Sequence, residues 1–439
     1  MLSTSRGCDP TAREPTNECV DVHALAAPRA LPRDRSSLTA SPWAVAFTVA
    51  AVYAVLLVPG LLQDPNQFAN IGREFLNRGT TSTAIKPSFH TVGKIGYDGQ
   101  FYYFLALDPK HGKDDMEAPG LIYSRIGYPM TVRALSAGKA SVIPYMMVLV
   151  NIAAAVGGTL AVAFFLRRHG LPPLLALLYG FFPGLWLAVS RDLTEPLAFC
   201  LAAAGLVVFD PQSKKRLLGS AALFGLAMLT RETVALFPAV LALALLVGAG
   251  STATSWGDRL RIGNLLRAAA FAEIAFLPLF AWRHVVTIWI HTTAVQERPA
   301  GGPAGGVLYS LAPFHAMAAQ WPWSAEDVVD LLTVVVPAVV WAVIAIVLLL
   351  RRRWSPALWL VLINAAVFVV FLPSPVAVEY ISMGRASIGV VLAVLIALPQ
   401  VMKSLGEKSK LCFAALSLWS LPYYLLISGL LHGVVSRLV

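Results

Sequence analysis

Apolar runs alternate with short polar connections along most of the chain beyond residue 41. A helix rises 1.5 Å per residue, so about 20 apolar residues cross the ~30 Å hydrocarbon core of a bilayer. The pattern therefore predicts an all-α polytopic membrane protein with about eleven transmembrane helices. The predicted spans are 42–62, 142–166, 172–190, 194–209, 217–230, 233–249, 265–289, 328–350, 355–372, 386–402 and 411–432.

The first 40 residues follow a different pattern. They are rich in Arg, Pro, Thr, Ser and Asp, and they lack the apolar stretch of a cleavable signal peptide. We expect residues 1–40 to form a disordered cytoplasmic tail, because they offer too little apolar surface to offset chain entropy. Residues 41–439 then form a single transmembrane domain.

The connections between the runs fall into two alternating classes. Those reading "RALPRDRSS", "LRRHG", "DPQSKKR", "WGDRLRIGNLLR", "RRRW" and "KSLGEKSK" are basic, which is typical of cytoplasmic loops. The other class comprises the long segment 63–141, "SRDLTEP", "TRET", 290–327 and "PSPVAVEYISMGR". We expect these on the extracytoplasmic face of the cell membrane, with the N-terminus inside and the C-terminus outside.

Composition supports this class of protein. The chain is 57% hydrophobic and 13% charged, whereas a soluble domain carries roughly 25% charged residues. The formal charge of +10 is dispersed over short loops, with no basic stripe of the kind that binds nucleic acid. The four cysteines have neither metal-ligand spacing nor a disulfide pattern.

Two local patterns predict departures from simple spans. The runs 217–230 and 233–249 are short, which favours a hairpin with "TRET" at its apex below the outer surface, or two tilted helices with a tight turn. The segment 66–79 has Phe68, Ile71, Phe75 and Leu76 at helical spacing, which predicts an amphipathic helix lying on the outer leaflet.

The long segment 63–141 is the "first outer loop", and it contains the stretch "GYDGQFYYFLALDP". The carboxylate of Asp98 lies there among aromatic side chains, where it can take a proton from a hydroxyl group, a step typically worth 10²–10⁴ in rate. Gly96 and Gly99 would let the backbone turn sharply. Gln100 would orient Asp98 or bind the acceptor, and Tyr97, Phe101 and Tyr102 would form walls. In the alternative, Asp98 caps a short helix and pairs with Arg125.

Asp64 and Asp108 are competing candidates for the base. Further ionisable residues occur in the other outer motifs. Such residues at membrane depth cost about 2.5–3.5 kcal/mol each, so they mark sites or pathways. An arginine fork matches phosphate oxygens. We therefore expect one shared site. Besides Tyr97, Gln100 and Tyr102, its substrate-binding residues are Arg125, Arg191, Asp192, Glu195, Arg231, Glu232, Glu379, Tyr380 and Arg385.

The segments "YDGQFYY", "RIGYP", "DLTEPLA" and "GLAMLTRET" resemble a bacterial family of polytopic glycosyltransferases of the GT-C type, related to the PIG-V-like mannosyltransferases. The resemblance covers residues 42–400 and is most specific in the first outer loop. It implies an inverting transfer of a sugar, hexosyl or mannosyl, from a polyprenyl-phosphate donor to a glycan, lipid or protein acceptor on the outer face. The protein O-mannosyltransferase branch has a paired acid motif where Asp98 stands alone, so the acceptor is left open.

By motif match, the resemblance assigns the general base to Asp98 and contacts with the donor phosphate to Arg125, Arg231 and Arg385. It implies no cofactor, and we expect no metal site. Two other classes of function remain. A lipid-linked sugar flippase or transporter would use the charges without chemistry, although no internal repeat is visible. An assembly subunit would not depend on Asp98. The sugar, the acceptor and the oligomeric state are not defined by the sequence.

Overall fold

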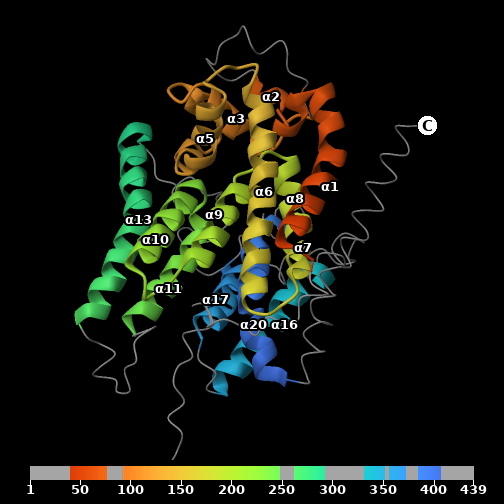
Figure 1. Cartoon of the computed structure of the whole chain (residues 1–439). Helices are drawn as coiled ribbons and strands as arrows, with labels where there is room; N and C mark the ends of the chain where they lie inside the picture. The colour runs from red at the N-terminus through yellow and green to blue at the C-terminus, as the bar shows by residue number, and fades with distance from the viewer. Residues whose placement is uncertain are drawn as a thin grey trace, which may run out of the picture.

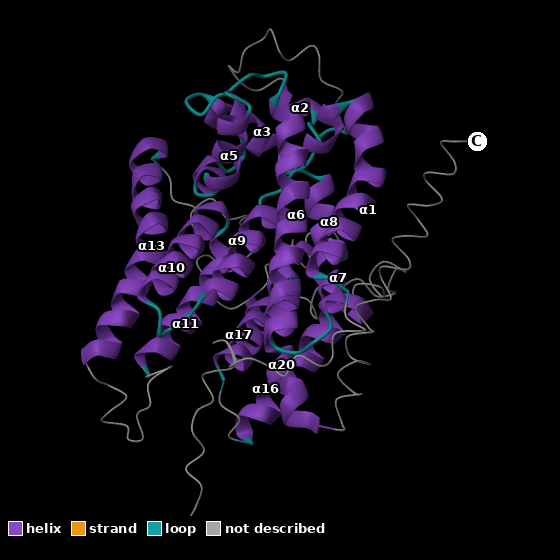
Figure 2. Cartoon of the chain, viewed as in Figure 1, coloured by secondary structure: helices purple, strands orange, loops and turns teal. Residues whose placement is uncertain are grey.

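The computed structural model describes residues 40–76, 91, 93–247, 262–291, 331–351, 355–371 and 384–406. Within these ranges the chain is helical, and its only strand-like pairing is an isolated bridge between Ile71 and Gly96 (Figures 1 and 2). This confirms the predicted all-α class. The predicted tail of residues 1–40 lies almost entirely outside the described ranges.

The helices follow the apolar runs closely, and every predicted run within the described ranges is occupied by helix; the run 411–432 lies outside them. The helices are α1 (Pro42–Gln63), η2 (Pro65–Ala69), α2 (Arg73–Leu76), α3 (Gly99–Leu107), η4 (Gly112–Asp115), α4 (Pro119–Tyr123), α5 (Gly127–Leu135), α6 (Ile143–Arg168), η5 (Pro173–Ala176), α7 (Leu177–Gly180), α8 (Pro183–Ser190), α9 (Glu195–Val208), α10 (Lys214–Thr230), η6 (Glu232–Ala235), α11 (Leu236–Leu246), α13 (Ile262–Ile290), η7 (Leu331–Val335), α16 (Val336–Leu350), α17 (Pro356–Phe371) and α20 (Ile388–Leu405).

Four described helices are long and apolar enough to cross a membrane by length and composition: Pro42–Gln63, Ile143–Arg168, Ile262–Ile290 and Gly384–Leu405. A fifth span is possible if Pro173–Gly180 and Pro183–Ser190, which meet at a 50° bend, count as one. Pro183 explains the break, since a proline at the start of a helix disfavours helical backbone in the residue before it. The structure thus supports a helical membrane protein, while the number eleven remains a prediction.

The short helices of the first outer loop gather at one end of the bundle, where α2, α3 and α5 lie together (Figure 1). Helix α6 runs from this end to the opposite one and finishes at Arg167 and Arg168, in the basic connection "LRRHG". The acidic motif of the first outer loop and this basic connection therefore lie at opposite ends of α6.

The predicted surface helix over 66–79 is wrong where the structure describes it. Asn70 takes a left-handed conformation at φ 50°, which separates η2 from α2. Phe68, Ile71 and Phe75 are buried in the protein core, and Phe75 packs edge-on against Phe101. The apolar positions follow helical spacing, but they pack inside the protein, Phe68 beside Gly60 of α1 and Phe75 against Phe101 of α3.

The "TRET" segment joins two helices that share α13 as a neighbour but make little contact with each other. Helix α10 packs on α9 and α13, whereas α11 packs on α13 and α17. Arg231 between them is extended, with φ −158° and ψ 124°, and this ends α10 before η6 begins. Two separate helices joined by a short break therefore describe this region better than a closely packed hairpin.

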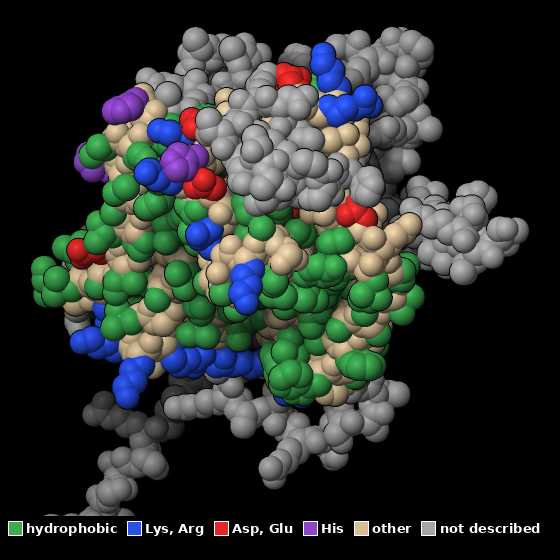
Figure 3. Space-filling model, turned by 90° about the horizontal axis from the view of Figure 1, so that it is seen from above, with side chains coloured by type: hydrophobic (Ala, Val, Ile, Leu, Met, Phe, Trp, Pro, Cys, Tyr) green, Lys and Arg blue, Asp and Glu red, His purple; other side chains and the backbone are tan. Residues whose placement is uncertain are grey.

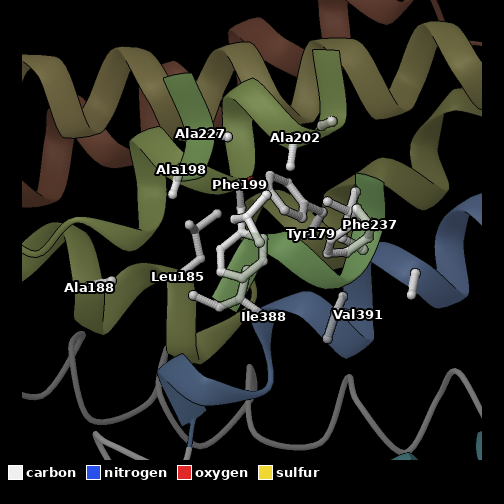
Figure 4. Packing of buried hydrophobic residues seen from close by; sticks show 14 of the residues in the cluster. Tyr179, Leu185, Ala188, Ala198, Phe199, Ala202, Ala227, Phe237, Ile388 and Val391 are labelled. Atoms are coloured by element: carbon white, nitrogen blue, oxygen red, sulfur yellow. The ribbon is translucent and has the colours of Figure 1, made fainter. Parts of the chain in front are cut away.

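Helix α20 is the most enclosed of the candidate spans, with residues Ile388–Leu398 all buried. It contacts α6, α7, α9, α16 and α17. Figure 4 shows Ile388 and Val391 of α20 near Leu185 of α8, Phe199 of α9 and Phe237 of α11. This packing fixes the first turn of α20, which begins one turn after Arg385.

Candidate functional site

The approach to Asp98 is built by two glycines with different roles. Gly96 adopts φ +74°, a left-handed conformation that favours glycine, and it pairs with Ile71 across the isolated bridge. Gly99 lies in the first turn of α3, where a Cβ atom would collide with the carbonyl oxygen of Arg191. Gly99 therefore serves close approach between α3 and the α8–α9 turn, whereas the sharp turn belongs to Gly96.

Asp98 occupies the N-cap position of α3, but its side chain makes no capping hydrogen bond. Its carboxylate instead accepts a hydrogen bond from Nη1 of Arg385 at 2.8 Å. The side chain of Asp98 is 33% exposed, against 11% for Arg385. The alternative in which Asp98 caps the helix and pairs with Arg125 is wrong, because the partner comes from a segment 287 residues away.

Arg385 connects Asp98 to a second carboxylate. Its Nε lies 3.7 Å from Oε1 of Glu195, the first residue of α9. The backbone before Arg385 is held by a close approach between Gly384 and Gly184, where a Cβ on Gly184 would collide with the carbonyl of Gly384. The first turn of α8 thus holds the backbone from which Arg385 extends.

A second arginine approaches the same carboxylate from α10. Arg231, the C-cap of α10, places Nη1 2.9 Å from Oε1 of Glu195 and 3.4 Å from the hydroxyl of Thr194. Glu195 is fully buried and Arg231 is 9% exposed. Since a buried charge is tolerated only when it is paired, Glu195 depends on these two guanidinium groups.

The third arginine forms a two-pronged ion pair. Arg125 donates from Nε and Nη2 to the two carboxylate oxygens of Glu232, at 2.9 Å and 2.7 Å, and from Nη1 to the hydroxyl of Tyr102 at 3.2 Å. Bidentate pairs of this kind are strong and fix orientation. A Cβ on Gly127 would collide with the hydroxyl of Thr230, so α5 and α10 meet closely beside this pair.

Arg191 completes the set from the α8–α9 turn. Its Nη1 donates to Oδ1 of Asn70 at 2.9 Å, and its guanidinium lies over the ring of Tyr97, 5.5 Å from the centroid. The guanidinium of Arg385 lies 5.3 Å from the same centroid. Among the described residues, Arg191 has no carboxylate partner.

Arginine pairing controls the charge of Asp98. Burial by itself raises the pKa of this carboxyl, but the ion pair and hydrogen bond with Arg385, together with the fields of Arg125 and Arg231, bring the pKa below its usual range. Asp98 is therefore ionised at neutral pH. It is also a weaker base while Arg385 holds it, because a lower pKa means a smaller tendency to take a proton.

Asp192 is a different kind of carboxyl. It is fully buried in a left-handed conformation at φ 51°, and neither of its carboxylate oxygens has a hydrogen-bond partner among the described residues. Burial raises the pKa of Asp192 well above its usual range. The structure therefore favours the uncharged acid at this position.

Asp192→Asn is expected to preserve or raise thermal stability at pH 7 to 8. A carboxyl whose pKa is raised by folding favours the folded state most when it is protonated. Its contribution to protein stability is complete below the unfolded pKa of about 3.9 and is lost as pH rises toward the folded pKa. Asparagine stays neutral and tolerates left-handed backbone. Melting temperatures of purified protein from pH 5 to 8, with exposed Glu117→Gln as control, measure this. A lower melting temperature for Asp192→Asn at pH 7 would contradict a neutral Asp192.

The other residues that the sequence assigns to the site differ in their contacts. The amide of Gln100 is buried and bonds the carbonyl of Ile95 and the N–H of Gly72, so it holds the bridge region and does not touch Asp98. Phe101 packs in the core. Tyr97 and Tyr102 contact the arginines. Glu379 and Tyr380 lie outside the described residues.

The competing carboxylates are engaged away from this network. One oxygen of Asp64 accepts from the N–H of Asn66 at the start of η2. Asp108 accepts from the N–H groups of Lys110 and His111, and its second oxygen lies 2.9 Å from Nδ1 of His111. Burial alone would raise the pKa of Asp108, but these bonds lower it.

Sequence reasoning missed Asn70 and Thr194 as partners of the arginines. Asn70 carries a weak signal, because asparagine is among the few residues that adopt left-handed backbone readily. The sequence offers no comparable signal for Thr194, apart from its position directly before Glu195. Within the described ranges, no three His, Cys, Asp or Glu residues are grouped to hold a metal ion.

Six charged side chains from distant segments thus form one "ionic network": Asp98, Arg125, Glu195, Arg231, Glu232 and Arg385. Seen from the end that carries α2, α3 and α5, charged side chains of both signs occur among the hydrophobic ones on the described surface (Figure 3).

No protein-family model, curated protein or solved structure matches the chain.

Proposed function

We propose that this protein is a membrane glycosyltransferase that moves a sugar from a polyprenyl-phosphate donor to an acceptor on the outer face, with Asp98 as general base. The observation that carries the proposal is the partly exposed carboxylate of Asp98, ionised and held by Arg385 at 2.8 Å beside Tyr97. Such a carboxylate can accept a proton, while aromatic rings suit sugar or isoprenoid surfaces.

The proposed reaction is a single displacement at the anomeric carbon. The acceptor hydroxyl attacks this carbon and its proton passes to the carboxylate of Asp98. The bond between the anomeric carbon and the phosphate oxygen breaks, and polyprenyl phosphate leaves with one additional negative charge. A guanidinium stabilises that charge through charge-assisted hydrogen bonds.

Transfer by the purified protein tests this function. The protein, reconstituted in lipid, is given a panel of polyprenyl-phosphate sugars with glycan, lipid and peptide acceptors, and the release of polyprenyl phosphate is measured together with the glycosylated product. Product formation supports the enzyme. Movement of the intact lipid-linked sugar across proteoliposomes, with no bond broken, would indicate a transporter instead.

The proposed site requires the first outer loop to face outward. We expect a cysteine at the exposed position 117 to react with an impermeant maleimide in intact cells, and a cysteine at the exposed position 215 to react only after permeabilisation, in a background with the native cysteines replaced. The readout is the labelling of these cysteines, and it does not depend on any enzyme or transport activity. Protection of position 117 together with labelling of position 215 would reverse the topology.

A further inference from the structure

Two guanidinium groups converge on one aromatic ring. Arg191 from the α8–α9 turn and Arg385 from the start of α20 lie 5.5 Å and 5.3 Å from the centroid of Tyr97. The two positive charges beside this ring repel each other, and nearby anions offset that repulsion. Asp98 is the anionic partner of Arg385, whereas the one hydrogen-bond acceptor of the Arg191 side chain among the described residues is the neutral amide oxygen of Asn70.

The balance of charges leaves room for one anion. Among the described residues, four arginines lie in this region, Arg125, Arg191, Arg231 and Arg385, against the three paired carboxylates Asp98, Glu195 and Glu232. The buried Asp192 has no hydrogen-bond partner among them, and its burial favours the uncharged acid. Both oxygens of Glu232 are already bound by Arg125, and Arg231 lies against the fully buried Glu195. The unbalanced guanidinium is therefore Arg191, beside the pair that contains Asp98.

Arg385 is also the partner best placed to change its contact. It holds Asp98 through a single hydrogen bond from Nη1, while its Nε lies 3.7 Å from Glu195. Glu195 also has Arg231 at 2.9 Å, so Arg385 can give up its bond to Asp98 while Glu195 stays paired. The fork of an arginine matches two phosphate oxygens. Asp98, at 33% side-chain exposure, lies on the accessible side of the pair.

We propose that the phosphate of the donor binds between Arg191 and Arg385 and takes Arg385 away from Asp98, so that donor binding releases the base. This inference rests on the proposed function. In the donor-free protein, the ion pair with Arg385 then keeps Asp98 a weak base. The donor both fills the site and restores the basicity of Asp98.

The charges balance through the reaction. The donor phosphodiester carries one negative charge, and polyprenyl phosphate carries one more when the bond to the sugar breaks. Asp98 loses its negative charge when it receives the acceptor proton. Arg385 therefore has a stronger attraction to the leaving phosphate, and a weaker one to Asp98, as transfer proceeds. The return of Arg385 to Asp98 follows loss of the proton and departure of the lipid.

Competition for one guanidinium is reciprocal, so removing the charge of Asp98 must tighten phosphate binding. Asp98→Asn is expected to bind polyprenyl monophosphate about five- to tenfold more tightly than the wild type, although its turnover should be much lower. Arg385→Gln should weaken binding and cancel the gain when combined with Asp98→Asn. Arg191→Gln should weaken binding in either background.

The measurement is a binding titration with polyprenyl monophosphate in phosphatidylcholine nanodiscs. Asp108→Asn is the matched control, because it removes a carboxylate of the same loop that pairs with His111 and not with an arginine, and its affinity should equal the wild type. Inorganic phosphate and phosphatidic acid serve as further probes. A parallel gain with inorganic phosphate supports recognition of the headgroup.

An Asp98→Asn affinity equal to or weaker than the wild type would overturn this inference, even if the variant has lost transfer and the proposed function stands. A gain with phosphatidic acid but not with polyprenyl monophosphate also overturns it, since the site would then serve ordinary lipid. Absence of both binding and transfer in the wild type would instead remove the proposed function, and this inference with it.

Discussion

Asp98→Asn is expected to lower the turnover of the purified protein by about 10²-fold or more at saturating donor. Asparagine keeps the size of the side chain and its N-cap position on α3, but it cannot accept a proton. Its amide oxygen can still accept a hydrogen bond from Arg385, so folding should survive. Turnover, thermal stability and donor affinity measured together separate loss of the base from loss of the fold.

Asp64→Asn and Asp108→Asn are the controls for this substitution. Both carboxylates lie in the first outer loop, and both engage nearby backbone N–H groups away from the ionic network. Their turnover should stay near that of the wild type. Asp98→Glu should keep partial activity, because the carboxylate remains but is displaced. Near-normal turnover in Asp98→Asn would remove Asp98 as the base.

Much of the fold follows from the sequence because apolar runs are a local signal. The run at 142–166 became α6, which ends at Arg167 and Arg168 as the basic connection suggested. The prediction of a surface helix over 66–79 is wrong, because helical spacing identifies a buried face without saying what covers it. The left-handed Asn70 and the packing of Phe75 on Phe101 belong to tertiary structure.

The sequence predicts which charged residues belong to the candidate site, but not which of them form ion pairs with each other. Charged residues in otherwise apolar surroundings stand out in a sequence, and the structure brings Asp98, Glu195 and Arg385 together. Which arginine meets which carboxylate depends on contacts between segments as much as 287 residues apart. Gln100 shows the limit, because it lies two residues from Asp98 in the sequence but its side chain bonds backbone groups of Ile95 and Gly72.

The pairings change what each arginine is expected to do. The sequence put Arg125, Arg231 and Arg385 forward as phosphate ligands alike. In the structure Arg125 is bound at both prongs by Glu232, which suits a fixed structural cation. Arg385 makes one hydrogen bond to a partly exposed carboxylate. Substitution of Arg125 should therefore be dominated by stability, and substitution of Arg385 by donor use.

The largest expected effect on stability follows from breaking the Arg125–Glu232 pair. Glu232→Ala leaves the Arg125 side chain, which is only 10% exposed, without its carboxylate partner. Removal of one partner of a buried ion pair costs about 3–5 kcal/mol, because the remaining charge is buried and uncompensated. We expect a correspondingly lower free energy of unfolding in denaturant titrations of the purified protein.

A double substitution identifies the cause of that loss. Arg125→Met combined with Glu232→Leu removes both charges and keeps apolar volume, so it should recover a large part of the lost stability. The matched control is the Arg216–Asp210 pair, which is 2.8 Å long against 2.7 Å for Arg125–Glu232 but has side chains 37% and 19% exposed. Arg216→Ala should cost about 1 kcal/mol or less. If Glu232→Ala costs no more than Arg216→Ala, the Arg125–Glu232 pair is solvated, and Arg125 returns as a ligand for the donor phosphate.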